Sequence, residues 1–87
     1  MTKRENLDGK ILGELIYKWR KEQNITQRKV AEDTGIDEKT VSRLERGIQI
    51  PETMTLYKFC IEAKMDITQL FHDYQKEEEK QNQNEDE

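Results

Sequence analysis

Three cationic side chains and one hydroxyl share a single face of a short helix predicted from Glu38 to Arg46. At about 100° per residue, Val41 and Leu44 mark the buried side of this helix, and the opposite face carries no acidic residue. Long cationic side chains on a narrow helix can reach the edges of DNA bases, where Arg and Lys bond guanine O6 and N7. A solvated surface helix would look the same, so the neighbouring segments must decide between the two interpretations. The residues of this face are Lys39, Ser42, Arg43 and Arg46.

Glu38 lies beside this face, in the first turn of the same helix, and its role has two interpretations. The carboxylate could accept a hydrogen bond from N4 of cytosine. It could equally stabilise the helix alone, because an acidic side chain near a helix N-terminus interacts favourably with the macrodipole. Together with Asp37, it also weakens the non-specific attraction of the helix to DNA phosphates.

Phosphate contacts are expected from the preceding helix, predicted from Gln27 to Thr34 with Thr26 as its N-cap. The free N–H groups at a helix start and the positive end of the helix dipole attract anions. Gln27 occupies the first position and can hydrogen-bond a phosphate oxygen, and Arg28 and Lys29 are further candidates. Such contacts set the register on the duplex and supply most of the salt-sensitive affinity.

The connection between these two helices is too short for anything but a sharp corner. Gly35 follows the first helix, where the chain must turn with a positive φ that only glycine adopts at low cost. Asp37 is a good N-cap for the second helix, and Gly47 is a good C-terminal stop. The two helices are expected to nearly touch at Ala31, Gly35 and Val41. This spacing is typical of a helix-turn-helix, whose second helix fits the major groove, and it favours base recognition over a merely solvated surface.

Apolar residues at helical spacing predict three further helices. The first runs from Gly9 to Gln23 and ends at Asn24, which tolerates the left-handed conformation. A fourth begins at Pro51 and is expected to be largely buried, and a fifth opens at Asp66. Because no segment alternates apolar and polar residues over more than a few positions, we expect an all-α chain with five helices. The apolar residues of the fourth helix are Met54, Leu56, Tyr57, Phe59, Cys60, Ile61 and Ala63.

The net charge of −4 comes from the C-terminal segment alone. Residues 75–87 contain six acidic and two basic side chains, whereas the preceding residues are neutral overall. Such a composition cannot bury enough apolar surface to offset the entropy of ordering, so a disordered acidic tail is predicted there. The tail could keep the protein soluble, repel stray DNA or contact a protein partner. Residues 1–8 are predicted to form a flexible arm, with Lys3 and Arg4 as candidates for a phosphate contact, and residues 9–74 the folded domain.

Composition argues against membrane, secreted and enzymatic roles. No apolar run approaches the roughly 18 residues of a membrane span, and the N-terminal sequence lacks the apolar stretch of a secretory signal. Cys60 is the one cysteine, so no internal disulfide can form and a reducing, cytoplasmic setting is expected. His72 is the one histidine, and neither a cysteine pair nor a glycine-rich phosphate loop accompanies it. We therefore expect no metal, no cofactor and no catalysis.

From about Leu12 to Phe71, the chain resembles the Cro/C1-type helix-turn-helix family, also called the XRE-like regulators. The resemblance rests on LGELIYKWRKEQNITQRKVAEDTG, on TVSRLERG and on the proline-led pair of closing helices. It implies an all-α, compact five-helix bundle, the lambda-repressor-like fold of the family. One departure is Lys64, which stands where the family often has glycine at the end of the fourth helix.

The resemblance also implies roles for individual residues. Gln27 matches the phosphate-binding glutamine of the family. Arg20, which is easily taken for a DNA contact, is expected to form a structural ion pair with Glu45. The positions that commonly read bases match Glu38, Lys39, Thr40 and Arg43.

Members of this family are mostly bacterial and phage repressors or activators that bind palindromic operators as dimers. The chain is therefore expected to bind double-stranded DNA as a homodimeric repressor. Phe71 and Tyr74 of the fifth helix are expected to form the dimer interface, while Leu70 belongs to the core. The alternative is a protein-interaction module with weak or no DNA binding, such as an antirepressor, an adaptor or the antitoxin component of a toxin–antitoxin pair.

Overall fold

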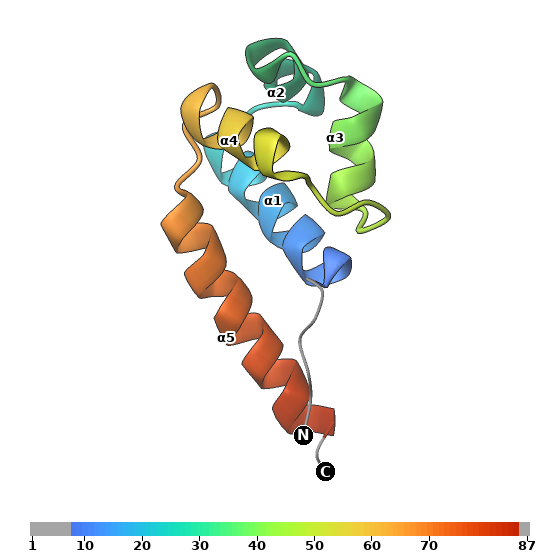
Figure 1. Ribbon diagram of the computed structural model, residues 1–87, viewed down its shortest axis with the longest axis vertical. Helices are drawn as coiled ribbons and strands as arrows, with labels where there is room; N and C mark the ends of the chain where they lie inside the picture. The colour runs from blue at the N-terminus through green and yellow to red at the C-terminus, as the bar shows by residue number, and fades with distance from the viewer. Residues whose placement is uncertain (1–7, 86–87) are drawn as a thin grey trace.

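The computed structural model describes residues 8–85, which form five helices and contain no strand (Figure 1). The predicted all-α architecture is therefore confirmed for this part of the chain. Lys3 and Arg4, the candidates in the N-terminal arm, lie outside the described residues, and so does the end of the tail at 86–87. In chain order the helices are α1 (Gly9–Gln23), α2 (Gln27–Thr34), α3 (Glu38–Glu45), α4 (Thr53–Ile61) and α5 (Ile67–Glu85).

The central element of the bundle is α1, which packs against both α3 and α5 (Figure 1). Asp8 caps this helix, because its Oδ1 accepts the N–H of Lys10 at 2.9 Å. Asp8 therefore belongs to the helix start, although it was predicted as the last residue of a flexible arm. The side chains with almost no exposed surface are Leu12, Ile16, Val30, Val41, Leu44 and Phe59.

The end of α1 is a left-handed turn at Asn24, which has a φ of 60°, as predicted. The N–H of Ile25 donates to the carbonyl oxygen of Arg20 at 3.4 Å, and that of Asn24 donates to Lys21 at 3.0 Å. These two bonds satisfy carbonyl groups that the helix leaves without an internal partner. The tight turn lets α2 begin at Gln27, close to the end of α1.

At Gly13 the backbones of α1 and α3 approach closely. A Cβ atom at this position would lie 2.3 Å from the carbonyl oxygen of Leu44 and 2.8 Å from that of Glu45. Contacts below about 3 Å do not occur for real Cβ atoms, so the observed helix separation requires glycine here. Nothing in the residue pattern had marked Gly13 as a contact.

Much less of α4 is buried than predicted. Phe59 is fully buried and packs edge-on against Trp19, with the ring centroids 6.1 Å apart. Met54, Tyr57 and Ile61 are instead exposed. The physical reason is that the bundle needs only one apolar face of this helix, and no other described element covers the opposite face.

Both ends of α4 also depart from the simplest expectation. The helix begins at Thr53, after Pro51 and not at it. Past its C-terminal end, Lys64 has a φ of 64°, and the N–H of Met65 donates to the carbonyl oxygen of Phe59 at 3.0 Å. The left-handed conformation costs a non-glycine residue about 1–2 kcal/mol, so this turn retains strain that glycine would avoid.

The predicted disorder from residue 75 is wrong for most of the tail, because α5 continues to Glu85. Asp66 starts this helix by accepting the N–H of Gln69 at 3.1 Å, and Tyr74 anchors its middle in the core. Lys, Glu and Gln have high helix propensity, and adding residues to an existing helix avoids the cost of a new nucleus. The polar segment therefore continues a helix that the folded domain has already nucleated.

Candidate DNA-binding surface

The corner between α2 and α3 is built from hydrogen bonds to the last turn of α2. Gly35 has a φ of 75°, and its N–H donates to the carbonyl oxygen of Ala31 at 2.8 Å. The hydroxyl of Thr34 donates to the carbonyl of Val30 at 2.7 Å and accepts the N–H of Ile36 at 3.2 Å. A Cβ on Gly35 would meet no described atom within 4 Å apart from its chain neighbours, so the expected helix contact at Gly35 is wrong. Glycine is needed there for its positive φ alone.

The inner face of α3 is held in the core by Val41 and Leu44, and its outer face is open. Lys39 and Arg43 are exposed on that outer face, and neither forms an ion pair with another residue in the described part of the chain. Asp37 takes the N-cap position with an extended backbone, but its side chain accepts no capping hydrogen bond. Lys39 and Arg43 are therefore available to an external ligand.

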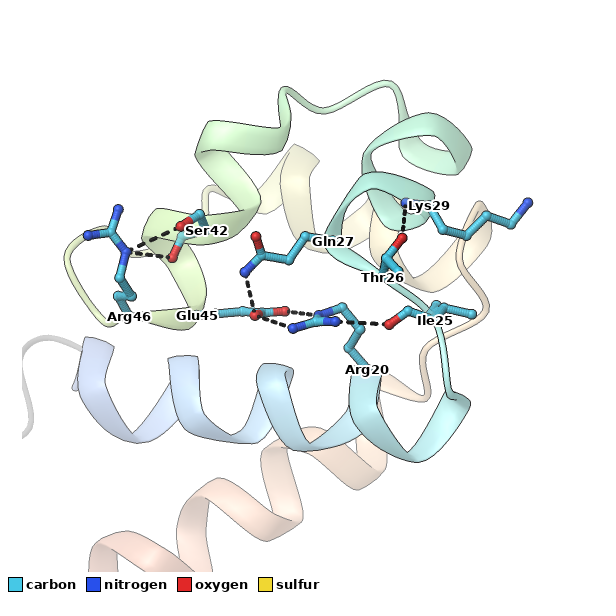
Figure 2. A network of polar contacts seen from close by, with 8 residues as sticks. All are labelled: Arg20, Ile25, Thr26, Gln27, Lys29, Ser42, Glu45 and Arg46. Carbon is cyan, nitrogen blue, oxygen red and sulfur yellow. Dashed lines mark hydrogen bonds and ion pairs between the residues drawn. The ribbon is translucent and has the colours of Figure 1, made fainter.

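Arg46 and Ser42 form a coupled pair on the same side of α3 (Figure 2). Arg46 is the C-cap of the helix rather than its last residue. Its Nε donates to the hydroxyl of Ser42 at 3.2 Å and lies 3.4 Å from the Ser42 carbonyl oxygen. The chain then turns at Gly47, which has a φ of 78° and acts as the predicted stop. Arg46 thus extends back along α3 and stays exposed.

A buried ion pair connects α3 to α1, as Figure 2 shows. The Nε of Arg20 lies 2.6 Å from Oε2 of Glu45, and its Nη2 donates to Oε1 at 3.0 Å. The remaining nitrogen, Nη1, donates to the carbonyl of Ile25 at 2.9 Å. The hydrogen bonds that Arg20 donates to Glu45 raise the pKa of Arg20, while burial opposes the increase. Arg20 therefore supports α3 from inside the fold and does not face outward.

Gln27, at the first position of α2, contacts this ion pair. Its Nε2 donates to Oε1 of Glu45 at 2.9 Å (Figure 2). A side-chain amide nitrogen carries two hydrogens, so this bond leaves one N–H for an acceptor such as a phosphate oxygen. The buried ion pair thus sets the orientation of the Gln27 side chain, which is predicted to bind a phosphate. No residue spacing in the sequence indicated this link.

The other cations of α2 are paired with acids one turn further along the helix. The Nε of Arg28 lies 3.6 Å from Glu32, and the Nζ of Lys29 lies 3.1 Å from Asp33. Exposed pairs of this kind contribute only a few tenths of a kcal/mol, so a phosphate can displace the acid. The unpaired positive charge of this surface is therefore concentrated on α3.

Two further base-reading candidates lie in the first turn of α3. Glu38 is exposed there, and Thr40 is half-buried. The N–H of Thr40 donates to the carbonyl of Asp37 at 2.9 Å and so closes the first turn. The structure brings the α3 candidates onto one helix, with α2 packed against it. Those on α3 are Glu38, Lys39, Thr40, Ser42 and Arg43, with Arg46 as the C-cap of the helix; those on α2 are Gln27 and Arg28.

The two residues predicted for a dimer interface have different surroundings. Phe71 is 40% exposed on α5. Tyr74 is only 6% exposed, its hydroxyl accepts the N–H of Asp8 at 2.6 Å, and it donates to Glu78 at 3.4 Å. Tyr74 is therefore a core residue and not part of a free partner surface. It was misassigned because its helical spacing from Phe71 does not show that α1 covers it.

Comparison with known proteins identifies the family to which the chain belongs. A model of the helix-turn-helix family matches residues 16–69, which include all of α2, α3 and α4. The chain is also similar to the ImmF control region 10 kDa protein of Bacillus phage phi105, with 38% identity over 64 residues, or 74% of this chain and 71% of that protein. The chain belongs to the Cro/C1-type helix-turn-helix family. It is thus a DNA-binding regulator by family, and the family is regulatory rather than enzymatic.

Outside this surface, the described part of this helix-turn-helix protein contains no second candidate functional site. His72 is exposed on α5, and no cluster of three or more potential metal-ligating side chains occurs among the described residues. Burial raises the pKa of the Cys60 thiol, which lowers its reactivity. A cavity of about 110 Å³ between α1 and α5 is smaller than the roughly 300 Å³ typical of small-molecule sites. Within residues 8–85, no helix combines the length and the apolar character that a membrane crossing needs.

Proposed function

We propose that this helix-turn-helix protein is a sequence-specific transcriptional repressor that acts in the cytoplasm as a dimer on a palindromic operator. The observation that supports this most directly is the open face of α3, where Lys39 and Arg43 are exposed without an ion-pair partner among the described residues. A helix of this kind fits the major groove, where its cations can bond guanine.

The contacts divide into two kinds in this proposal. Lys39 and Arg43 read base edges, with Glu38 and Thr40 beside them in the first turn of α3. Gln27 offers its second amide hydrogen to a phosphate, and Arg28 adds a displaceable charge. Phosphate contacts fix the register, and base contacts supply the sequence preference.

Dimerisation follows from the small size of the recognition surface. One domain with a single recognition helix covers a short half-site, which gives too little discrimination against the rest of a genome. Two copies on half-sites about one helical turn apart combine their specificity. Repression then needs only that the bound dimer occupy DNA required by the transcription machinery. The relative from a phage control region is consistent with such a regulatory role.

Selection from a random double-stranded DNA library, followed by binding measured by fluorescence anisotropy, tests the proposal. Arg43→Ala should weaken binding to the selected sequence by about 1–3 kcal/mol, and the affinity of the parent protein should fall steeply with salt. Lys18→Ala, which removes an exposed cation from α1, is the matched control and should bind like the parent. Failure to select any sequence would contradict the proposal.

A protein-interaction module is the second candidate. The ion pairs of Arg28 and Lys29 with their own helix, together with the exposed Glu38, reduce the attraction of this surface for DNA. An adaptor or antirepressor would show weak DNA binding without sequence preference. Equal affinities of the parent and Arg43→Ala for all duplexes would favour this candidate over a repressor.

A further inference from the structure

The carboxylate of Glu45 lies between the end of α1 and the start of α2. Its Oε2 is 2.6 Å from Nε of Arg20, and its Oε1 accepts hydrogen bonds from Nη2 of Arg20 at 3.0 Å and from Nε2 of Gln27 at 2.9 Å (Figure 2). The Glu45 side chain is only 3% exposed. A two-point contact with a guanidinium fixes the plane of a carboxylate as well as its position. Oε1 therefore presents a fixed acceptor to the first residue of α2.

Arg20 is itself held by contacts that do not involve Glu45. Its Nη1 donates to the carbonyl oxygen of Ile25 at 2.9 Å, and its Cζ lies 5.4 Å from the centroid of the Tyr17 ring. A cation over an aromatic face at this separation is attracted to the ring. Because Ile25 lies just before α2, the ion pair contacts both the backbone that leads into this helix and the side chain of its first residue.

The hydrogen bond to Glu45 fixes which way the Gln27 amide faces. A carboxylate only accepts hydrogen bonds, so the nitrogen of the amide, and not its oxygen, must face Glu45. The second N–H of a planar amide diverges from the first and so faces away from this acceptor. The backbone N–H of Gln27 also lacks an intrahelical acceptor, as at every first helical position. Gln27 therefore offers two donors at the start of α2, and Glu45 orients one of them.

From these contacts we propose that Glu45 is a positioning residue for DNA binding, which holds the Gln27 amide in the orientation that a phosphate of the duplex requires. The inference rests on the proposed function and deepens it, because Glu45 acts through Gln27 and touches no phosphate itself. A side chain that is ordered before binding loses less conformational freedom when the phosphate arrives, so the complex is tighter.

Charge alone predicts the opposite effect of Glu45 on DNA binding. A carboxylate near a phosphate repels it, so removal of the negative charge would strengthen the complex if electrostatic attraction were the main effect. Positioning predicts instead that the same change weakens the complex. The sign of the change in affinity therefore separates the two explanations.

Fluorescence anisotropy with the selected duplex and the variants Glu45→Gln, Gln27→Ala and their double variant tests the proposal. Each single variant should raise the Kd roughly tenfold, because each removes or misdirects a hydrogen bond to a charged oxygen. The double variant should bind about as weakly as Gln27→Ala, because Glu45 then has no amide to orient. Losses of binding free energy that add would overturn the proposal, and so would unchanged or tighter binding by either single variant.

A second cycle and a charge control separate positioning from a shift of α3 as a whole. Glu45→Gln combined with Arg43→Ala should give additive losses, because the base contact of Arg43 does not pass through Gln27. Coupling to Arg43 in place of Gln27 would overturn the proposal. Glu22→Gln is the matched control, since it removes an exposed carboxylate from α1 beside the cavity against α5, and it should bind DNA like the parent.

The free parent protein provides a test that needs no variant, which matters because Glu45→Gln leaves Arg20 with a neutral partner and lowers stability. In NMR spectra, the side-chain amide of Gln27 should show a heteronuclear NOE as high as the backbone, whereas the amide of the exposed Gln23 should show a much lower value. A Gln27 amide as mobile as that of Gln23 would overturn the proposal. Titrations of the variants are made at a temperature at which circular dichroism shows each one folded.

The two proposals fail in different ways. A parent that selects no DNA sequence contradicts the repressor, and the positioning role fails with it. A parent that selects a sequence and loses affinity on Arg43→Ala, but shows no coupling between Glu45 and Gln27, contradicts the positioning role alone.

Discussion

Arg20 and Glu45 form a contact whose loss would leave a charge uncompensated in the interior. Both residues are 8% exposed, so removing either partner isolates the other away from water. Gln27 donates to the same carboxylate and so connects the start of α2 to the pair. Three elements depend on one side chain of α3, which makes Glu45 the most informative single position to change.

Glu45→Ala should lower the free energy of unfolding by about 2–4 kcal/mol, because the Arg20 guanidinium would remain buried without its carboxylate. Urea unfolding monitored by circular dichroism measures the change. Glu38→Ala is the control: it removes an exposed glutamate from the same helix and should cost less than about 1 kcal/mol. Equal stability of Glu45→Ala and the parent would show that the pair does not support the fold.

At the residue level, sequence reasoning succeeded where helical periodicity decides exposure. Val41 and Leu44 are buried and Lys39 and Arg43 are exposed, as the wheel of α3 predicted. Periodicity carries no information on which helix covers a given face, so the burial of Tyr74 could not be derived.

At the level of elements, the separation of α1 and α3 is fixed by the missing side chain of Gly13. Gly13→Ala should destabilise the protein by about 1–3 kcal/mol, because the added methyl group would overlap the carbonyl of Leu44. The sign of this change in stability is informative, because a Gly→Ala substitution in an unconstrained helix interior stabilises the protein by up to about 1 kcal/mol. Thermal and urea unfolding measure the difference.

Glu14→Ala, at the adjacent exposed position of α1, is the comparison for this substitution. It should leave the midpoint of unfolding nearly unchanged. A Gly13→Ala protein more stable than its parent would mean that the two helices can separate at little cost.

The end of α1 and both ends of α2 followed from a capping threonine and left-handed residues, which act locally. As predicted from the residue types, α1 ends at Asn24, and α2 is capped by Thr26 and ends at Gly35. The errors were non-local: the outer face of α4 is exposed because no described element packs over it, and α5 continues past residue 75 because it is already nucleated. Such outcomes depend on the arrangement of the whole bundle.

On the scale of the whole molecule, Tyr74 connects the first helix to the last. Burial raises the pKa of its phenol above the usual value near 10. The unfolded chain therefore loses this proton first, so the stabilisation is complete below about pH 10 and is lost as the pH rises through the folded-state pKa. Urea unfolding between pH 8 and pH 11.5 should show falling stability at the alkaline end.

Tyr74→Phe isolates the contribution of this group. It should be less stable at neutral pH, since the N–H of Asp8 loses its acceptor, and its alkaline decline should be shallower than that of the parent. Identical alkaline slopes would assign the decline to other groups.

The position of α3 is fixed by its close approach to Gly13 of α1 and by the ion pair of Glu45. Lys39 and Arg43 take part in neither contact. Replacing these two side chains therefore carries little thermodynamic penalty and does not tilt the helix axis. If α3 reads DNA as proposed, a lineage can acquire a new target through a few codon changes, and paralogues that differ only on this face can coexist in one cell without cross-talk.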